Sequence, residues 1–220
     1  MSIAYDSAAM RLCPASRRRQ AGFTLIEMMG VVAFIGIVVA AATPSWIELT
    51  KDRRVESAAQ NIADLYRTAR TRSMGRGSAV LVRWDGNSAQ PTDSSPAGHF
   101  TVREAVAGPT GASNNLPSAS CFAADWADTG ATSKFVGAFD ERRKRYEPAE
   151  AKFLDDAGNT QQFASICFTP AGRTFVRYTA AGTFKVLAGV PRVQVANTTT
   201  KFNRFVVFPP HGSARVVSQM

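Results

Sequence analysis

The sequence predicts an α+β fold in which one long N-terminal helix packs on a C-terminal antiparallel β-sheet domain. An uncharged apolar run near the N-terminus is long enough to cross a membrane, and a regular apolar stripe continues the helix beyond it. The rest of the chain alternates short β-type runs with turn residues. We therefore expect the first half of the helix in the membrane and the sheet against the second half.

Composition limits the classes of function. The 220 residues are 45% hydrophobic and 20% charged, which excludes a disordered chain and allows one folded domain with an appendage. The formal net charge is +9. The two histidines, His99 and His211, are far apart in the sequence, so we expect no multi-histidine metal site and predict neither a metal nor a cofactor.

The apolar run covers residues 28–47 without a single charge. As a helix it spans about 30 Å, the thickness of the hydrocarbon layer of a bilayer. The arginines at 17–19 precede it and are expected on the cytoplasmic side. A cleaved secretory signal is the first rival, because Ala40 and Ala42 form a small-x-small cleavage site that would leave Thr43 as the first residue.

Two observations oppose that rival. Glu27 stands near the head of the run, where a carboxylate that reached the bilayer centre would cost about 2.5–3.5 kcal/mol without a partner. Helical patterning also continues beyond Pro44, which is unexpected if the first forty-odd residues are discarded. The apolar positions that recur there at steps of three and four are Val55, Ala58, Ala59, Ile62, Leu65, Tyr66 and Ala69.

The segment RRRQAGFTLIEMM, residues 17–29, resembles the leader of type IV pilins and type II secretion pseudopilins. The resemblance implies that residues 1–22 are a leader peptide, removed by a prepilin peptidase that cuts after Gly22. Phe23 then becomes the N-terminal residue and is N-methylated. The resemblance also implies that Glu27 faces the terminal amino group of an adjacent subunit, so that two charges that are costly in apolar surroundings neutralise each other. The alternative for Glu27 is a carboxylate that snorkels to the membrane surface.

Cleavage after Gly22 also affects the odd number of cysteines. It removes Cys13 and leaves Cys121 and Cys167, both in the part expected outside the cytoplasm. We predict that these two form a disulfide. Two buried free thiols are the alternative.

The mature chain is expected to begin with one helix over residues 23–76, of which 28–47 span the membrane. Gly36 and Pro44 lie in its apolar half, and Pro44 removes a backbone donor, so a kink or local melting is expected there. Gly75 and Gly77 are expected to end the helix. Residues 77–220 then form the β-rich head.

Strands are expected where β-type residues lie between turn signals. The predicted strands are residues 79–84, 99–106, 163–168, 173–178, 183–187, 192–198 and 202–208. One apolar face of their sheet should cover the stripe at Val55, Ile62 and Leu65. Residues 87–96 and 108–120, rich in Ser, Pro, Gly and Asp, are expected to be long surface loops.

Two C-terminal segments, CFTPAGRTF and FNRFVVFPPHGSARVV, resemble strand-turn-strand pieces of the FimT/GspH-like minor pilin group. The middle region, about 87–156, and the cysteine pair depart from the pattern of that group. The major pilin pattern, in which the cysteine pair encloses the C-terminal segment, is not met either, since more than fifty residues follow Cys167.

We find no motif for catalysis. A glycine-rich phosphate loop, HExxH, CxxC and GxSxG are all missing from the sequence. Asp93, Ser94, Ser95 and His99 are close together, but in a loop that gives no rigid scaffold to orient a nucleophile and a base. His211, between Pro210 and Gly212, is read as a turn residue. We therefore predict that the chain is not an enzyme.

Residues 157–220 contain cations and no Asp or Glu. The seven cations are Arg173, Arg177, Lys185, Arg192, Lys201, Arg204 and Arg215. Such a basic half could contact DNA phosphates, and some FimT-like pilins are implicated in DNA uptake. The alternative is a solvated sheet face, because cations alternate with apolar residues along the strands. Arg142, Arg143, Lys144 and Arg145, flanked by acids, are read as a solvated helix face.

The resemblance predicts a minor type IV pilin that helps to start pilus assembly or stands at the pilus tip. Its expected partners are other minor pilins, the major pilin, the prepilin peptidase, the inner-membrane assembly platform and, before assembly, membrane lipid. We expect a single inner-membrane span with a cytoplasmic N-terminus and a periplasmic head, which later reaches the cell surface in the pilus. The alternatives are a GspH-like minor pseudopilin of a type II secretion system, a DNA-binding minor pilin of a competence pilus, and a secreted binding module with a long signal sequence.

Overall fold

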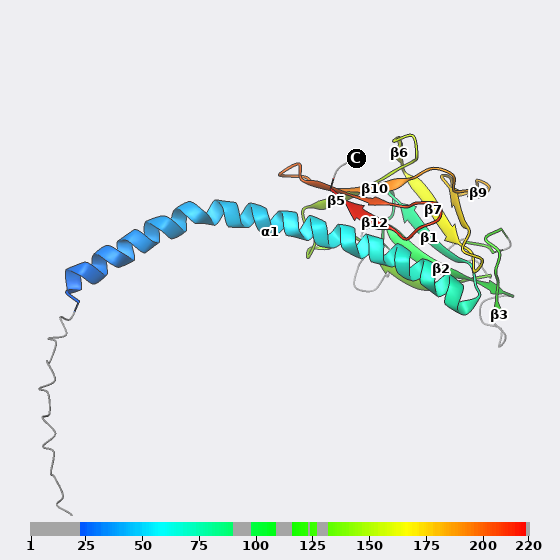
Figure 1. Cartoon of the computed structure of the whole chain (residues 1–220), viewed down its shortest axis with the longest axis horizontal. Coiled ribbons are helices and arrows are strands. Elements are labelled where there is room, and N and C mark those ends of the chain that lie inside the picture. Colours follow the sequence, from blue (N-terminus) through cyan, green and yellow to red (C-terminus); the bar gives the residue numbers. More distant parts are fainter. Residues whose placement is uncertain (1–22, 90–97, 109–115, 123, 127–131, 219–220) are drawn as a thin grey trace, which may run out of the picture. The chain divides into compact units, whose positions relative to one another are not determined.

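The computed structural model describes residues 23–89, 98–108, 116–122, 124–126 and 132–218. Within these residues one helix, α1 (Leu25–Arg76), is followed by twelve strands (Figure 1). The strands are β1 (Val80–Asp85), β2 (Phe100–Ala107), β3 (Leu116–Pro117), β4 (Ser133–Phe139), β5 (Ala149–Leu154), β6 (Thr160–Gln161), β7 (Phe163–Phe168), β8 (Thr174–Arg177), β9 (Lys185–Val186), β10 (Arg192–Asn197), β11 (Asn203–Val207) and β12 (Arg215–Val217). The predicted α+β architecture is confirmed.

Helix α1 is 52 residues long. Thr24 caps its start, and Gly77 ends it with a φ of 67°, a left-handed conformation that glycine adopts without steric cost. Gly75, which was also expected to end the helix, lies inside it. Leu25–Arg76 is therefore close to the predicted range of 23–76.

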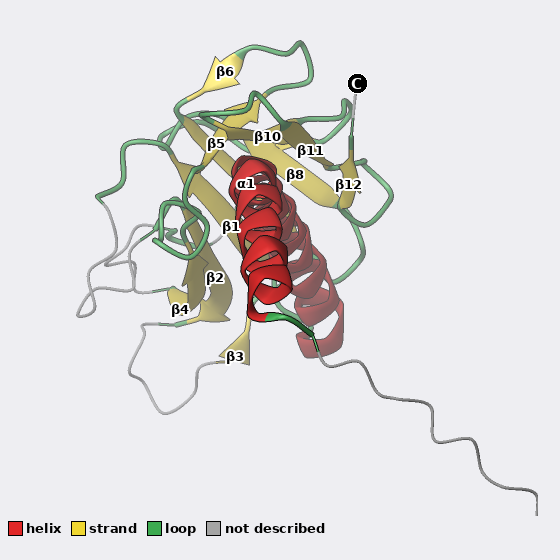
Figure 2. Cartoon of the chain, turned by 90° about the vertical axis from the view of Figure 1, so that its left-hand side faces the viewer, coloured by secondary structure: helices red, strands yellow, loops and turns green. Residues whose placement is uncertain are grey.

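The chain divides at Pro44 into two compact units. The second unit contains residues 45–76 of α1 together with the strands, because the apolar stripe of the helix is buried against them (Figure 2). Every residue of the predicted stripe is buried except Leu65, which is half-buried. The stripe predicted from three- and four-residue spacing is thus the part of the core that α1 contributes. The predicted boundary at residue 77 is the end of the helix and lies inside this second unit.

Two antiparallel sheets provide the rest of that core. The larger sheet has the order β3-β2-β1-β7-β8-β9, with β4 also paired to β2, and the smaller has the order β12-β11-β10-β5-β6. The central strands alternate in burial as expected for sheets with one covered face: Val193 and Val195 of β10 are buried, whereas Arg192 and Gln194 are half-buried. Phe153 and Ile166 place both sheets in the same core as Ile62 of the helix.

All seven predicted strands are present, with ends shifted by up to two residues. Five strands were not predicted: β3, β4, β5, β6 and β12. Strand β5 has the sequence AEAKFL, which is rich in helix-forming residues, yet it pairs with β10 over six residues. Packing on the core therefore overrides intrinsic propensity in this strand. Strand β3 lies inside the segment 108–120 that was predicted to be a loop.

The interpretation of residues 142–145 as a helix face is wrong. Residues 141–148 form consecutive turns between β4 and β5. Arg142 is held there because its guanidinium binds the buried carboxylate of Asp140, with Nη2 2.5 Å from Oδ2. Side chains two residues apart do not face each other on a helix, so the pair between Asp140 and Arg142 requires a non-helical backbone. Arg143, Lys144 and Arg145 are exposed.

A buried carboxylate fastens the last turns of α1 to β2. The side chain of Glu104 belongs to a residue that is only 3% exposed. Arg72 Nε donates to its Oε2 and Ser78 Oγ donates to its Oε1, each at 2.8 Å, and Arg76 Nε lies 2.7 Å from Oε1. Burial by itself opposes the ionisation of Glu104, but the hydrogen bonds from Ser78 and Arg72 and the charges of Arg72 and Arg76 outweigh it. The pKa of Glu104 is therefore lowered.

This network predicts an acid-sensitive contribution to stability. A carboxylate with a lowered pKa stabilises the fold above its unfolded pKa, about 4.3 for Glu, and loses this contribution as the pH falls toward its folded pKa. We expect Glu104→Gln to lower the free energy of unfolding at pH 7 by about 2 kcal/mol and to flatten its decline below about pH 4.3. Chemical denaturation of the full chain in detergent between pH 3 and 7 measures both effects. An unchanged pH profile would contradict the role of Glu104.

Candidate assembly segment and head surface

The first turn of α1 holds the residues predicted to act in processing and assembly. The hydroxyl oxygen of Thr24 accepts a hydrogen bond from the backbone N–H of Glu27 at 3.3 Å. Thr24 is thus the N-cap and Glu27 the third helical residue, the spacing of a capping box. A carboxylate in this place is favoured by the helix dipole and remains exposed, as does Phe23. Gly22, on the other side of the predicted cleavage point, lies outside the described residues.

The apolar half of α1 buries none of its side chains. Every residue from Phe23 to Thr50 is exposed, including large side chains such as Ile26, Phe34 and Ile37. Among the described residues, α1 is the one helix that is long and apolar enough to cross a membrane. Exposed apolar surface of this extent is not stable in water, so a bilayer or neighbouring helices must cover it.

The backbone of α1 is continuous through Gly36 and Pro44. Pro44 has no N–H to offer to the carbonyl of Ala40. Next to it, the hydroxyl of Thr43 donates to the carbonyl oxygen of Val39 at 2.7 Å. The local melting expected near Pro44 is therefore not present, and a kink at Gly36 or Pro44 stays a prediction.

A disulfide joins Cys121 to Cys167, the pairing predicted from the sequence, and their Cα atoms are 6.1 Å apart. Cys167 is on β7, and its side chain belongs to a second, smaller apolar cluster on the opposite face of the larger sheet from the helix. The indole of Trp126 donates to the carbonyl oxygen of Cys121 at 2.8 Å. The bridge thereby fastens the segment around Cys121 over Leu81 of β1.

A buried ionic cluster connects two segments of the head, one at His99 and the other at residues 140–142. His99 Nδ1 lies 2.6 Å from Oε1 of Glu141, and the backbone N–H of His99 donates to Asp140 at 3.3 Å. Burial opposes ionisation of Asp140, but the hydrogen bonds and charge of Arg142 outweigh it and lower the pKa of Asp140. The ligand atoms of His99, Asp140 and Glu141 lie within 4.8 Å of one another, close enough to share a cation. Arg142 already neutralises Asp140, so the cluster is best explained as a structural network.

The sequence did not reveal this cluster, because Asp140 and Glu141 are more than forty residues from His99. Asp93, Ser94 and Ser95, considered with His99 as a catalytic group, lie outside the described residues. His99 itself is buried against Trp84, with ring centroids 4.6 Å apart. His211 is an exposed turn residue.

The seven cations of residues 157–220 do not form one surface. Arg173, Arg177 and Lys185 belong to the larger sheet and its turns, and the other four belong to the smaller sheet. Arg204 binds Glu56 of α1 through its Nε, so its charge is already neutralised. Arg177 is half-buried over the ring of Phe184, 4.6 Å from the centroid, whereas Arg192 and Arg215 lie in register on either side of Val207 in the smaller sheet.

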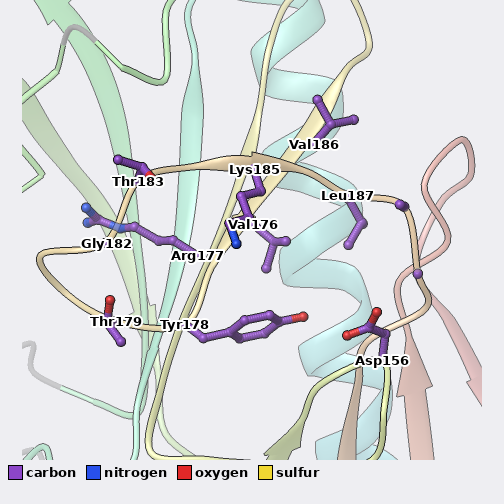
Figure 3. Close-up of a pocket in the computed structure, with 12 residues that line it drawn as sticks. Asp156, Val176, Arg177, Tyr178, Thr179, Gly182, Thr183, Lys185, Val186 and Leu187 are labelled. Carbon is purple, nitrogen blue, oxygen red and sulfur yellow. The ribbon is translucent and has the colours of Figure 1, made fainter.

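Arg177 also lines the cavity shown in Figure 3, about 560 Å³, between the end of β8, the turn that follows it and β9. Its guanidinium points toward Gly182, whereas the hydroxyl of Tyr178 points toward Asp156. Burial, with the nearby charges of Asp156 and Asp155, raises the pKa of Tyr178 to about 12. Neither histidine nor cysteine is among the residues that line the cavity.

Comparison with known families identifies the N-terminal part. Residues 17–43 match the prokaryotic N-terminal methylation motif, which covers the predicted cleavage point, Phe23, Glu27 and most of the apolar run. The chain carries the signal of type IV pilins and pseudopilins. No curated protein and no solved structure matches the chain.

The motif and the fold agree. The prepilin signal supports a pilin or pseudopilin family protein, and a long apolar helix followed by antiparallel sheets is a pilin-like architecture. The signal indicates a structural subunit. The motif implies processing by a prepilin peptidase and assembly with other pilins, and together with the apolar helix it fits an inner-membrane anchor.

Proposed function

We propose that this pilin-class chain is a minor type IV pilin, which starts pilus assembly or stands at the pilus tip. The observation that carries the proposal is the exposed apolar half of α1 with Glu27 in its first turn, in a chain whose two sheets share one core with the second half of the helix. The apolar half needs a cover, which neighbouring helices would provide in a filament. The residues after Cys167 support a minor role, because they provide β8 to β12 rather than a short segment enclosed by the disulfide.

A minor pseudopilin of a type II secretion system is the second candidate. The methylation motif favours it equally, since both classes carry this signal. Binding to DNA is less well supported than either, because Arg204 is neutralised by Glu56 and the other cations are divided between the two sheets.

Deletion of the gene in the bacterium that encodes it tests the proposal. We expect piliation and twitching motility to be largely lost, because an initiating subunit acts before any filament grows, while the amount of major pilin in the membrane stays normal. Electron microscopy and immunoblotting of sheared pili measure this. Normal pili together with a loss of enzyme secretion would instead assign the chain to a type II secretion system.

A further inference from the structure

Two turns of the head flank the part of α1 that follows the apolar run. On one side, Arg54 Nη1 donates a hydrogen bond to the carbonyl oxygen of Glu147 at 3.0 Å. On another, Asn197 Nδ2 donates to Asp52 Oδ1 at 2.8 Å. A backbone hydrogen bond of 3.3 Å joins the two turns to each other. We call the surface formed by residues 48–54, 143–148 and 197–201 the basic end.

Cations outnumber acids in the basic end. Its cations are Lys51, Arg53, Arg54, Arg143, Lys144, Arg145 and Lys201, and its acids are Glu48, Asp52 and Glu147. All the cations are exposed except Lys51, which is half-buried. Within the described residues none of them forms an ion pair, whereas Arg67, Arg72, Arg76, Arg142 and Arg204 each bind a carboxylate. Asp52 is occupied by hydrogen bonds from Asn197 and Thr200. The positive charge of this surface is therefore not neutralised within the head.

The chain itself holds this surface close to the membrane. Arg54 follows Ile47, the last residue of the uncharged run, by seven helical residues, or about 10 Å. This stretch of α1 lies within the same compact unit as both turns. The side chain of Trp46 is 70% exposed beside Ile47, and tryptophan prefers the interface between headgroups and hydrocarbon. The basic end therefore begins within about one Debye length of the membrane surface.

We propose that the basic end binds anionic phospholipid headgroups of the leaflet from which the span emerges. Each Lys or Arg near an anionic surface raises the affinity about fivefold. The covalent tether also keeps the local lipid concentration high, so weak contacts suffice. An acidic face of a neighbouring subunit would use the same charges, but such a neighbour comes beside the span only on assembly, whereas the bilayer surrounds it before assembly. This inference rests on the membrane span and goes beyond the role proposed in the pilus.

Lysine reactivity tests this inference with the full processed chain. We would reconstitute it in vesicles of phosphatidylcholine alone and in vesicles that also contain about 30% phosphatidylglycerol, then acetylate briefly and quantify each lysine by mass spectrometry. Modification of Lys144 and Lys201 should fall at least about threefold in the anionic vesicles and recover in about 0.5 M salt. Lys134 and Lys185, which are exposed on β4 and β9, should react equally in both.

Matched variants separate this surface from general charge. The test variant removes the three exposed cations of one turn: Arg143→Ser, Lys144→Ser and Arg145→Ser. It should restore the reactivity of Lys201 in anionic vesicles. The control variant removes exposed cations elsewhere in the head: Arg173→Ser and Lys185→Ser. It should leave Lys201 protected, and the retained disulfide and melting temperature report folding in both variants.

Several results would overturn the inference. Equal reactivity of Lys144 and Lys201 in the two kinds of vesicle would overturn it. Protection of Lys134 in the anionic vesicles as strong as that of Lys144 would overturn it as well. Protection that arises only when other subunits are added, whatever the lipid, would assign the basic end to a protein partner. A chain that floats with neither kind of vesicle would refute the span, and with it this inference. By contrast, protection of Lys144 and Lys201 in the anionic vesicles, combined with normal piliation in the deletion strain, would refute only the proposed pilus role.

Discussion

Replacement of Glu27 by Gln is expected to leave processing intact and to lower incorporation into filaments at least about tenfold. Leaving one partner of a buried charge pair without the other costs about 3–5 kcal/mol, because the remaining charge stays unpaired in apolar surroundings. In a filament this remaining charge would be the amino group of Phe23 on the adjacent subunit. Gln matches Glu in size, so the variant tests charge rather than packing.

The helix itself should survive this substitution. Thr24 caps the first turn through the backbone N–H of residue 27, which Gln retains, and the interaction of Glu27 with the helix dipole contributes at most about 1 kcal/mol. A decrease in incorporation therefore reports the partner and not a frayed helix.

Immunoblots compare the amount of the protein in sheared filaments with the amount in membranes. N-terminal sequencing of the membrane form identifies the first residue of the mature chain. The mature chain should still begin at Phe23 in the variant. Glu48→Gln is a matched control, because Glu48 is an exposed carboxylate on the same helix just beyond the uncharged run. Normal incorporation of Glu27→Gln would refute the charge-pair role, and a mature chain that began at Thr43 would support ordinary secretion instead.

Removal of the disulfide by Cys121→Ser with Cys167→Ser is expected to lower the free energy of unfolding by about 4 kcal/mol. The two cysteines are separated by 46 residues, and closing a loop of this length restricts the unfolded chain by about that amount in the chain-entropy model. For a head of ordinary stability, this is a large share of the total.

The loss should begin in the segment that the bridge holds. Phe122, next to Cys121, packs on Phe175 and Phe184 but is 61% exposed, so these ring contacts alone hold it weakly. Denaturation of the full chain in detergent, with hydrogen exchange, would show the global loss and early opening around Trp126. A double variant within about 1 kcal/mol of the parent would contradict this account, as would alkylation of both cysteines without reduction in the exported protein.

The segment from the leader to the end of the helix could be predicted because its signals are local. Glycine, phenylalanine and glutamate at fixed spacing, an uncharged run and a stripe of apolar residues depend only on neighbours a few residues away. The same reason explains why the seven strands with β-type composition were predicted. Strand β5 was missed because its residues favour a helix by themselves, and only pairing with β10 overrides that preference.

Long-range contacts decided the rest. The sequence by itself determined the membrane-length helix, its capped first turn with Glu27, and the cysteines available for a bridge, because each follows from residue type and spacing. Only the tertiary structure paired Arg204 with Glu56, buried Glu141 beside His99, and brought the turns at 143–148 and 197–201 to the same stretch of the helix. These contacts join residues from about 40 to nearly 150 positions apart in the sequence. The order of strands in the two sheets decides which distant residues meet, and no local pattern encodes that order.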